Sequence, residues 1–224
     1  MKNIAVACHT LKDEVELVAK DLQVSYPIIW VDSGLHNVPK KLKETLQNQI
    51  DKIANVDNIV LLFGSCGNSL LGITSSNARL VFPKVDDCIS LFLGGNEQRR
   101  VMDREAPSYY LTKGYFESET SIWTEYSYCV KKYGPQKTKI IFDKLLNKYE
   151  KLRVIDTGAY EPEEIMESTL KMARVLGLDH ETITGSLRII YKAFKGEWDE
   201  EFVIVEPGQS ISLFDLGLGQ AVLK

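Results

Sequence analysis

The chain has 224 residues, of which 44% are hydrophobic and 26% charged, and its formal net charge is -4. This composition is that of an ordinary globular protein, and the length allows a core that needs no disulfide or metal to hold it together. The acidic balance argues against non-specific nucleic-acid binding, which requires a basic surface.

The N-terminal region does not have the pattern of a secretory signal. Its short apolar run, residues 1–7, is interrupted by Cys8 and His9. No apolar stretch approaches the roughly 20 residues that span a bilayer. We therefore expect a cytoplasmic protein, in which the four cysteines stay reduced and indicate ligands, catalysis or core packing rather than disulfides.

Strand-like and helix-like segments alternate over the first 95 residues or so. The expected strands are 4–7, 28–31, 58–63 and 79–83, and the expected helices are 11–22, 39–53, 70–75 and one that begins near 86 with Asp86 or Asp87 as its cap. Such alternation predicts an α/β fold with a doubly wound, mainly parallel sheet and helices on both faces, because parallel strands need crossover connections.

The middle of the chain has a different pattern. Residues 106–115 contain three tyrosines, a proline and a glycine, which favours an extended loop that either packs normally or folds over a site as a lid. Two helices, 119–133 and 135–149, are expected on either side of Gly134. We interpret roughly 97–150 as a helical and loop insertion in a single α/β domain, 1–224.

The alternation resumes in the last third of the chain. A strand is expected at 152–155, helices at 163–176 and 186–194, and a final strand at 202–205. The polar stretch around His180 is expected to be a loop. Cys129 lies in a helical stretch and is interpreted as structural.

Three cysteines follow expected strands. Cys8 ends the first strand, Cys66 lies just past the third, and Cys88 follows the fourth near a helix start. Ligands of open parallel sheets bind beyond the carboxyl ends of the strands, so these thiols could converge on one metal site. Three thiolates suit zinc, or an iron–sulfur cluster with one open iron. No C-x-x-C spacing is present, and simple packing stays the alternative, above all for Cys8 in its apolar strand.

Two further candidates lie near the same edge of the expected sheet. His36 follows the second strand and could be a fourth ligand or a catalytic acid or base, the alternative being an ordinary loop histidine. The turn at 64–69 could hold an anionic cofactor through Gly64, Ser65 and Gly67. It lacks the Gly-Lys-Ser/Thr of nucleotide-binding loops and the G-x-G-x-x-G pattern.

Several motifs together resemble a bacterial and archaeal domain family of unknown function, over nearly the whole chain. They are Ala7-Cys8-His9-Thr10-Leu11, Gly34-Leu35-His36-Asn37, Gly64-Ser65-Cys66-Gly67, Asp86-Asp87-Cys88-Ile89, Tyr109-Tyr110-Leu111-Thr112-Lys113-Gly114, Val154-Ile155-Asp156-Thr157-Gly158, Gly196-Glu197-Trp198 and Pro207-Gly208. The resemblance implies three recurring cysteines and genes that often lie beside corrinoid-dependent methyltransferases. Lys84 and Asp86 depart from the family, whose members often have Arg and then His there.

With this resemblance, we expect a three-cysteine iron–sulfur site, or a zinc site, that acts in anaerobic one-carbon or corrinoid-linked methyl metabolism. The expected partners are a corrinoid protein or methyltransferase and a small-molecule ligand, with no nucleic acid and no membrane. Two alternatives stay open: a non-catalytic protein that binds a corrinoid or a methyltransferase, and a phosphate- or nucleotide-binding α/β enzyme. Whether the protein is an enzyme is left open.

Overall fold

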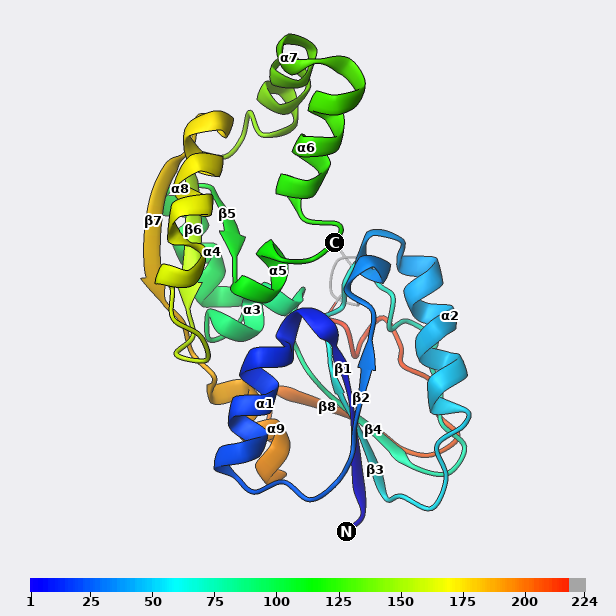
Figure 1. Ribbon diagram of the computed structural model, residues 1–224. Coiled ribbons are helices and arrows are strands. Elements are labelled where there is room, and N and C mark those ends of the chain that lie inside the picture. The colour runs from blue at the N-terminus through cyan, green and yellow to red at the C-terminus, as the bar shows by residue number, and fades with distance from the viewer. Residues whose placement is uncertain (218–224) are drawn as a thin grey trace. The chain divides into compact units, whose positions relative to one another are not determined.

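The computed structural model describes residues 1–217 and has a mixed α/β fold (Figure 1). The contacts within the chain divide it into two compact units. Unit 1 comprises residues 1–96 and 186–224, and unit 2 comprises residues 97–185. Each unit has a sheet of its own, so the expected α/β class holds with two sheets instead of one. That the chain forms a single domain stays a prediction.

The sheet of unit 1 has the strand order β2-β1-β3-β4-β8. Its strands are β1 (Asn3–Cys8), β2 (Ile28–Val31), β3 (Asn58–Leu62), β4 (Arg79–Pro83) and β8 (Phe202–Val205). The first four are parallel, and β8 runs antiparallel to β4 at the edge. The expected parallel sheet is thus confirmed for the first third of the chain.

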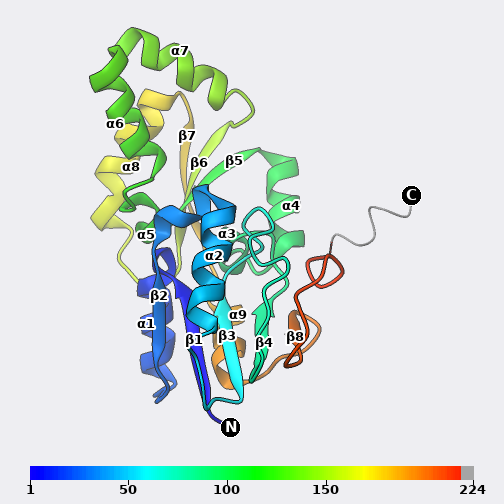
Figure 2. The ribbon, with the colours of Figure 1, turned by 90° about the vertical axis from the view of Figure 1, so that its right-hand side faces the viewer.

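Helices cover both faces of this sheet, with α1 and α9 on one face and α2 on the other (Figures 1 and 2). The helical segments of unit 1 are η1 (His9–Leu11), α1 (Lys12–Asp21), η2 (Ser33–Asn37), α2 (Pro39–Ile50), α3 (Cys88–Phe92) and α9 (Arg188–Lys195). The α2 helix begins at Pro39 and buries Leu42, Leu46 and Ile50 on one stripe. Because both faces are covered, every residue of β3 is buried.

The strand order places a topological switch point between β1 and β3. From β1 the chain crosses to β2 on one side and then to β3 on the other side of β1. Adjacent loops therefore leave the sheet in opposite directions at the carboxyl ends of β1 and β3. In open α/β sheets this is the position where ligands bind.

Unit 2 is built on a parallel sheet with the order β5-β6-β7. Its strands are β5 (Ser108–Leu111), β6 (Lys151–Asp156) and β7 (Asp179–Thr184), and its helices are α4 (Asn96–Glu105), α5 (Lys113–Phe116), α6 (Ile122–Tyr133), α7 (Pro135–Leu145) and α8 (Glu163–Leu176). The break at Gly134 between α6 and α7 is confirmed, and Gly134 has a φ of 79°. Apolar residues of α8 and β6 form the centre of a separate core.

Three sequence-based expectations are wrong. The tyrosine-rich stretch 106–115 is not a loop, because it contains β5 and α5; tyrosine is a good strand former. The polar stretch around His180 is the strand β7, whose Glu181 lies beside Arg153 of β6 and whose His180 Nε2 lies 2.9 Å from the hydroxyl of Thr169. Residues 70–75 form no helix, because a turn at 70–72 leads to an isolated bridge between Thr74 and Ser210. The supposed insertion therefore contributes to a second sheet.

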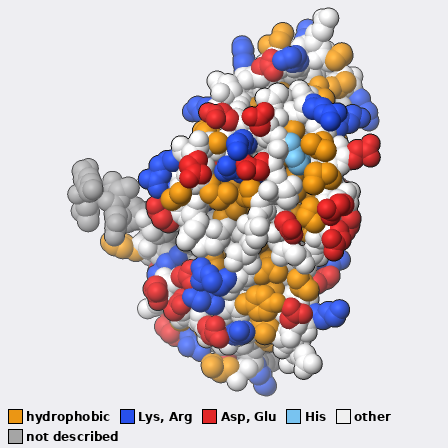
Figure 3. Space-filling view, turned by 90° about the vertical axis from the view of Figure 1, so that its left-hand side faces the viewer, with side chains coloured by type: hydrophobic (Ala, Val, Ile, Leu, Met, Phe, Trp, Pro, Cys, Tyr) orange, Lys and Arg blue, Asp and Glu red, His pale blue; other side chains and the backbone are white. Residues whose placement is uncertain are grey.

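No helix within residues 1–217 is long and apolar enough to cross a membrane. On the face shown in Figure 3, acidic and basic side chains are interspersed with apolar ones, and no broad basic patch appears. The mixture of charges on this face (Figure 3) is in keeping with the net charge of -4.

Candidate functional site: a cluster of three thiols

The three cysteines expected to converge lie in unit 1 at its switch point. Cys8 is the last residue of β1, Cys66 lies in the turn after β3, and Cys88 is the first residue of α3. The Sγ atoms of Cys66 and Cys88 are 3.9 Å apart. Cys88 is also close enough to Cys8 to raise the pKa of the Cys8 thiol.

Gly64 allows the turn that carries Cys66 to approach the segment that carries Cys88. A Cβ atom at Gly64 would lie 2.3 Å from the Cα of Asp87, closer than side chains tolerate. The amide of Ser65 donates to the carbonyl of Val85 at 2.9 Å, and the amide of Cys66 donates to that of Asp86 at 3.0 Å. These main-chain bonds, made possible by a missing side chain, fix the distance between Cys66 and Cys88.

The backbone at Cys66 is in an uncommon conformation. Its φ is 42°, and Gly67 and Asn68 continue in the left-handed region with φ values of 67° and 66°. A cysteine rarely adopts this conformation, and such strain persists where the surrounding structure imposes it. Here the two main-chain bonds to the 85–86 segment impose it and turn the Cys66 side chain toward Cys88.

The cluster is mostly enclosed by protein. Cys8 is 4% and Cys88 1% exposed, whereas Cys66 is half-buried and gives access from solvent. The hydroxyl of Thr10, itself buried, lies 3.1 Å from the Cys8 sulfur. The backbone of Thr10 also hydrogen-bonds the Cys8 thiol, and that of Gly64 hydrogen-bonds the Cys88 thiol. The site is therefore a sulfur-lined position with one open side.

Two of the thiols, Cys8 and Cys88, have raised pKa values. The contact with Cys88, together with burial, raises the pKa of Cys8 far above its ordinary value. The contact with Cys66, together with burial, likewise raises the pKa of Cys88. Because adjacent thiolates repel each other and lose hydration, both groups are neutral at pH 7 when no cation is near. Neither is thus an activated nucleophile, which requires a thiolate.

One distance between sulfur atoms, that between Cys66 and Cys88, matches the distance expected in a metal site. Two sulfurs on one zinc ion, each about 2.3 Å from it, lie about 3.8 Å apart, close to the 3.9 Å between Cys66 and Cys88. Within residues 1–217, however, no group of three or more His, Cys, Asp or Glu side chains is arranged to hold a metal ion. The three thiols are therefore adjacent without being in ligand geometry, and Cys8 is engaged by Thr10.

Helix α3 begins where the sequence indicates. The carboxylate of Asp87 accepts hydrogen bonds of 3.0 Å from both the amide and the hydroxyl of Ser90, so Asp87 is the N-cap. This cap holds Cys88 at the first position of the helix. Thr10 is a site residue that the sequence analysis missed, and the available signal is a hydroxyl two residues after a cysteine that ends a strand.

The histidines have different surroundings. His36 lies in η2 directly after β2, half-buried, at the same carboxyl edge of the sheet as the cysteines, and its role stays a prediction. His9 is exposed and packs edge-on against Trp30, with 6.0 Å between ring centroids. Cys129 lies in α6 and packs against the core of unit 2, in agreement with a structural role.

The turn that contains Gly64, Ser65 and Gly67 has fewer available amide donors for an anion than its composition indicates. The amides of Ser65 and Cys66 are already bonded to carbonyl oxygens of residues 85 and 86. No helix follows the turn, so the dipole that helps to bind phosphate is missing as well. An anionic cofactor at these residues stays a prediction with reduced support.

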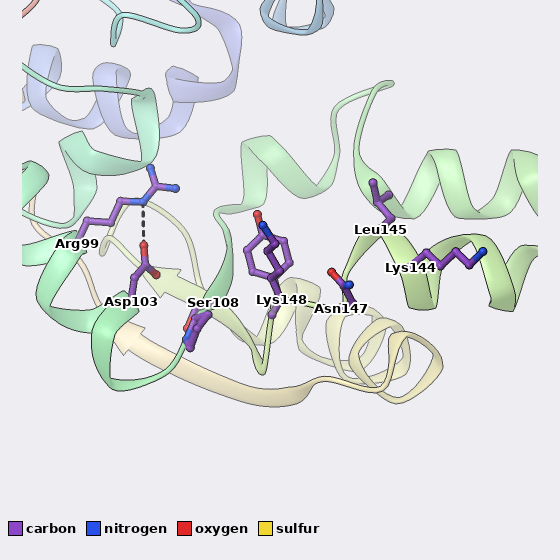
Figure 4. Close-up of a pocket in the computed structure, with 9 residues that line it drawn as sticks. Arg99, Asp103, Ser108, Lys144, Leu145, Asn147 and Lys148 are labelled. Atoms are coloured by element: carbon purple, nitrogen blue, oxygen red, sulfur yellow. Dashed lines mark ion pairs between the residues drawn. The ribbon is translucent and has the colours of Figure 1, made fainter. Parts of the chain in front are cut away.

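Unit 2 contains a cavity of about 570 Å³ with several cations on its walls (Figure 4). Arg99 forms an ion pair with Asp103, which also accepts a hydrogen bond of 2.9 Å from the hydroxyl of Tyr110. The ammonium group of Lys144 points away from the Arg99 guanidinium (Figure 4). Because the cations do not converge, this cavity lacks the arrangement of an anion-binding site.

Comparisons with known proteins give a family and nothing closer. No curated protein matches the chain, and no solved structure matches it. One family model, described as protein of unknown function (DUF1638), matches residues 30–194, a range that contains Cys66 and Cys88 but not Cys8. This match spans more than half of the chain. The chain therefore belongs to the DUF1638 family of proteins of unknown function.

Proposed function

We propose that Cys8, Cys66 and Cys88 bind a metal centre at the switch point of unit 1, an iron–sulfur cluster in the first place and a zinc ion as the alternative. The observation that carries this proposal is the 3.9 Å separation of the Cys66 and Cys88 sulfurs. Sulfur donors of this kind select zinc and iron–sulfur clusters among biological metals.

The surroundings of the sulfurs fit such a group. The Thr10 hydroxyl and the backbone of Thr10 and Gly64 hydrogen-bond the sulfurs, and contacts of this type orient thiolate ligands and tune a metal. A bound metal would displace the thiol protons, and its positive charge would offset the repulsion between the resulting thiolates. Three protein ligands leave one metal position open, where an iron or zinc ion can accept a substrate.

The remaining roles in this proposal belong to residues at the same edge. Cys66, the half-buried member, would lie on the side from which a small molecule reaches the metal. His36 would either bind the metal as a fourth ligand or hold and release a proton near it as an acid or base. The placement of the reaction in anaerobic one-carbon or corrinoid-linked methyl metabolism, with a corrinoid protein or methyltransferase as partner, is supported by the motif resemblance alone.

The test is metal and sulfide analysis of the full chain purified without oxygen, combined with absorption spectroscopy. We expect about four irons per chain and a brown colour for the cluster, or about one zinc and no colour. Serine in place of Cys8, Cys66 or Cys88 should each reduce metal content by at least tenfold. The matched control is Cys129→Ser, which removes the cysteine of unit 2 and should retain the metal.

A folded protein that takes up neither metal would end the proposal, as would equal metal loss in Cys129→Ser.

The two alternative functions predict different results. A non-catalytic corrinoid- or methyltransferase-binding protein would retain its partner in Cys66→Ser. A nucleotide-binding enzyme would be stabilised against heat by nucleotides but not by metals.

A further inference from the structure

Helices α6 and α7 of unit 2 expose an unusual amount of apolar surface. Tyr128 is 58%, Ile140 58% and Leu145 57% exposed, and Tyr133 and Ile141 are also exposed. A groove of about 500 Å³ lies between the two helices and is lined by Tyr128, Cys129, Ile141, Phe142 and Leu145. We refer to it as the α6–α7 groove. Exposed apolar surface of this extent on neighbouring helices indicates an interaction site.

The charges at the groove and on α7 are of opposite sign. Glu119 and Glu125 line the groove, which has no cationic residue in its lining. Helix α7 exposes Lys137, Lys139 and Lys144, of which Lys139 pairs with Asp143 of the same helix at 2.7 Å. Within the described residues, no ion pair involves the two glutamates, Lys137 or Lys144.

We propose that the chain forms a two-fold symmetric dimer in which each copy lays the exposed face of its α7 into the α6–α7 groove of the other. The occupant that the groove favours is a helix that presents aliphatic side chains and cations on one exposed face. Helix α7 is such a helix, with Ile140, Ile141 and Leu145 beside Lys137 and Lys144. A two-fold axis uses this complementarity twice, since each copy supplies both a groove and a helix.

The energetic basis is apolar burial, and the charges select the partner. Burying a large aliphatic side chain stabilises a complex relative to leaving it exposed. Three exposed aliphatic residues on each α7 therefore favour association. The opposite charges exclude other arrangements, because like charges placed together at an interface are repulsive.

The test uses two sets of charge reversals in the full chain. Glu119→Lys with Glu125→Lys makes the groove basic, and Lys137→Glu with Lys144→Glu makes α7 acidic. Sedimentation velocity or light scattering should show the wild type at twice the chain mass of 25.4 kDa at high concentration. Each reversed protein alone should dissociate at least tenfold more readily, because both of its groove–helix contacts become repulsive.

The decisive measurement is a mixture of the two reversed proteins. Both contacts between unlike copies are then attractive, so the mixture should recover association to within a few-fold of the wild type. This recovery also shows that both variants are folded. The control is Glu44→Lys with Lys52→Glu, two exposed residues of unit 1, which should leave association unchanged.

A wild-type chain that stays monomeric up to several hundred micromolar would overturn the proposal and leave the groove to a different protein. A dimer unaffected by both sets of reversals would overturn it as well, because the interface would then lie elsewhere. The outcome does not depend on metal content, since all of the substituted residues lie outside the thiol cluster.

Discussion

Gly64 shows how one residue without a side chain can position a site. The turn after β3 and the segment before α3 are joined by amide–carbonyl bonds at 2.9 and 3.0 Å, and this approach leaves no room for a Cβ atom. Cys66 and Cys88 are separated by 21 residues in the sequence, and their sulfurs meet because of this close approach.

We predict that Gly64→Ala will lower the free energy of unfolding by about 3 kcal/mol or more, because a methyl group forced into a packed region displaces backbone. It should also separate the two sulfurs and reduce metal uptake. Denaturant unfolding and metal analysis check both effects. The matched control is Gly158→Ala, where φ is 70° but no atom lies within 4 Å of the new Cβ, so that only about 1–2 kcal/mol is expected.

The short distance between Cys66 and Cys88 leads to a second prediction. Metal-free protein treated with hydrogen peroxide should form a Cys66–Cys88 disulfide: the two thiols lose two protons and two electrons, and the peroxide becomes two waters. Their sulfurs need to close from 3.9 Å to the bond length of about 2.05 Å. Mass spectrometry should locate the disulfide between these residues. Cys66→Ser should lack it and Cys129→Ser should retain it; a disulfide involving Cys129 would contradict the described cluster.

At the scale of elements, ion pairs connect α9 to the segment that leads into β8. Glu201 accepts hydrogen bonds from Arg188 and from Lys192, and Lys192 also pairs with Asp199 at 2.6 Å. These cations, Arg188 foremost, lower the pKa of Glu201 to about 2 although partial burial opposes the shift. All four residues lie in unit 1. The ion pairs therefore hold α9 to the segment before β8 within that unit.

This shift predicts how stability depends on pH. Because the folded-state pKa of Glu201 lies below its unfolded value of about 4.3, the ionised carboxylate stabilises the fold above pH 5 or so. This contribution is lost as pH falls from about 5 toward 2. Glu201→Gln should therefore lower stability at pH 7 by about 1 kcal/mol, a modest amount because the group is partly hydrated, and by much less near pH 2. Urea unfolding at several pH values measures the difference; an equal loss at pH 7 and pH 2 would assign the effect to packing.

An ion pair connects the strands β6 and β7 of unit 2. Arg153 of β6 has a side chain only 6% exposed, and its Nε lies 3.0 Å from the carboxylate of Glu181 on β7. Lys151 approaches the same carboxylate at 2.9 Å. The polar composition of β7 is thus explained by its position at a sheet edge, where one acid compensates a buried guanidinium.

We predict that Glu181→Leu will destabilise the protein by about 3 kcal/mol, because it leaves the Arg153 guanidinium buried without its counter-charge. The double variant Arg153→Leu with Glu181→Leu should be less destabilised than Glu181→Leu alone, since it removes both charges. Thermal or denaturant unfolding distinguishes the two. A double variant that loses as much as the sum of the single changes would show that the pair is not coupled.

At the scale of the whole molecule, metal binding should couple to folding. The three thiols come from segments that meet only in the folded chain, so a metal that binds them stabilises the folded state. At free zinc one hundred times the dissociation constant, we expect about 2.7 kcal/mol of added stability under reducing conditions. Cys88→Ser should show no such gain, and Cys129→Ser should show the full gain; a gain in both variants would place the binding elsewhere.

Local sequence patterns identify the strands of unit 1 and its helices α1, α2, α3 and α9. Buried parallel strands are continuous apolar runs, as in β3, and amphipathic helices repeat at a fixed spacing, as in α2, so local patterns identify both. The positions of Cys8 at the end of β1, of Cys66 after β3 and of Cys88 after β4 also followed from the sequence, because parallel strands end at one edge. The family match over residues 30–194 depends on the sequence in the same way.

The tertiary structure decided the rest. The strands β5 and β7 have compositions that local patterns assign to loops, and only pairing with β6 stabilises them as strands. The contact between Cys66 and Cys88 depends on backbone meeting at Gly64, and the contact of Thr10 with Cys8 depends on the turn after β1. Periodicity reports which face of an element is buried, whereas distances between segments far apart in the chain are set by packing and hydrogen bonds that no local pattern contains.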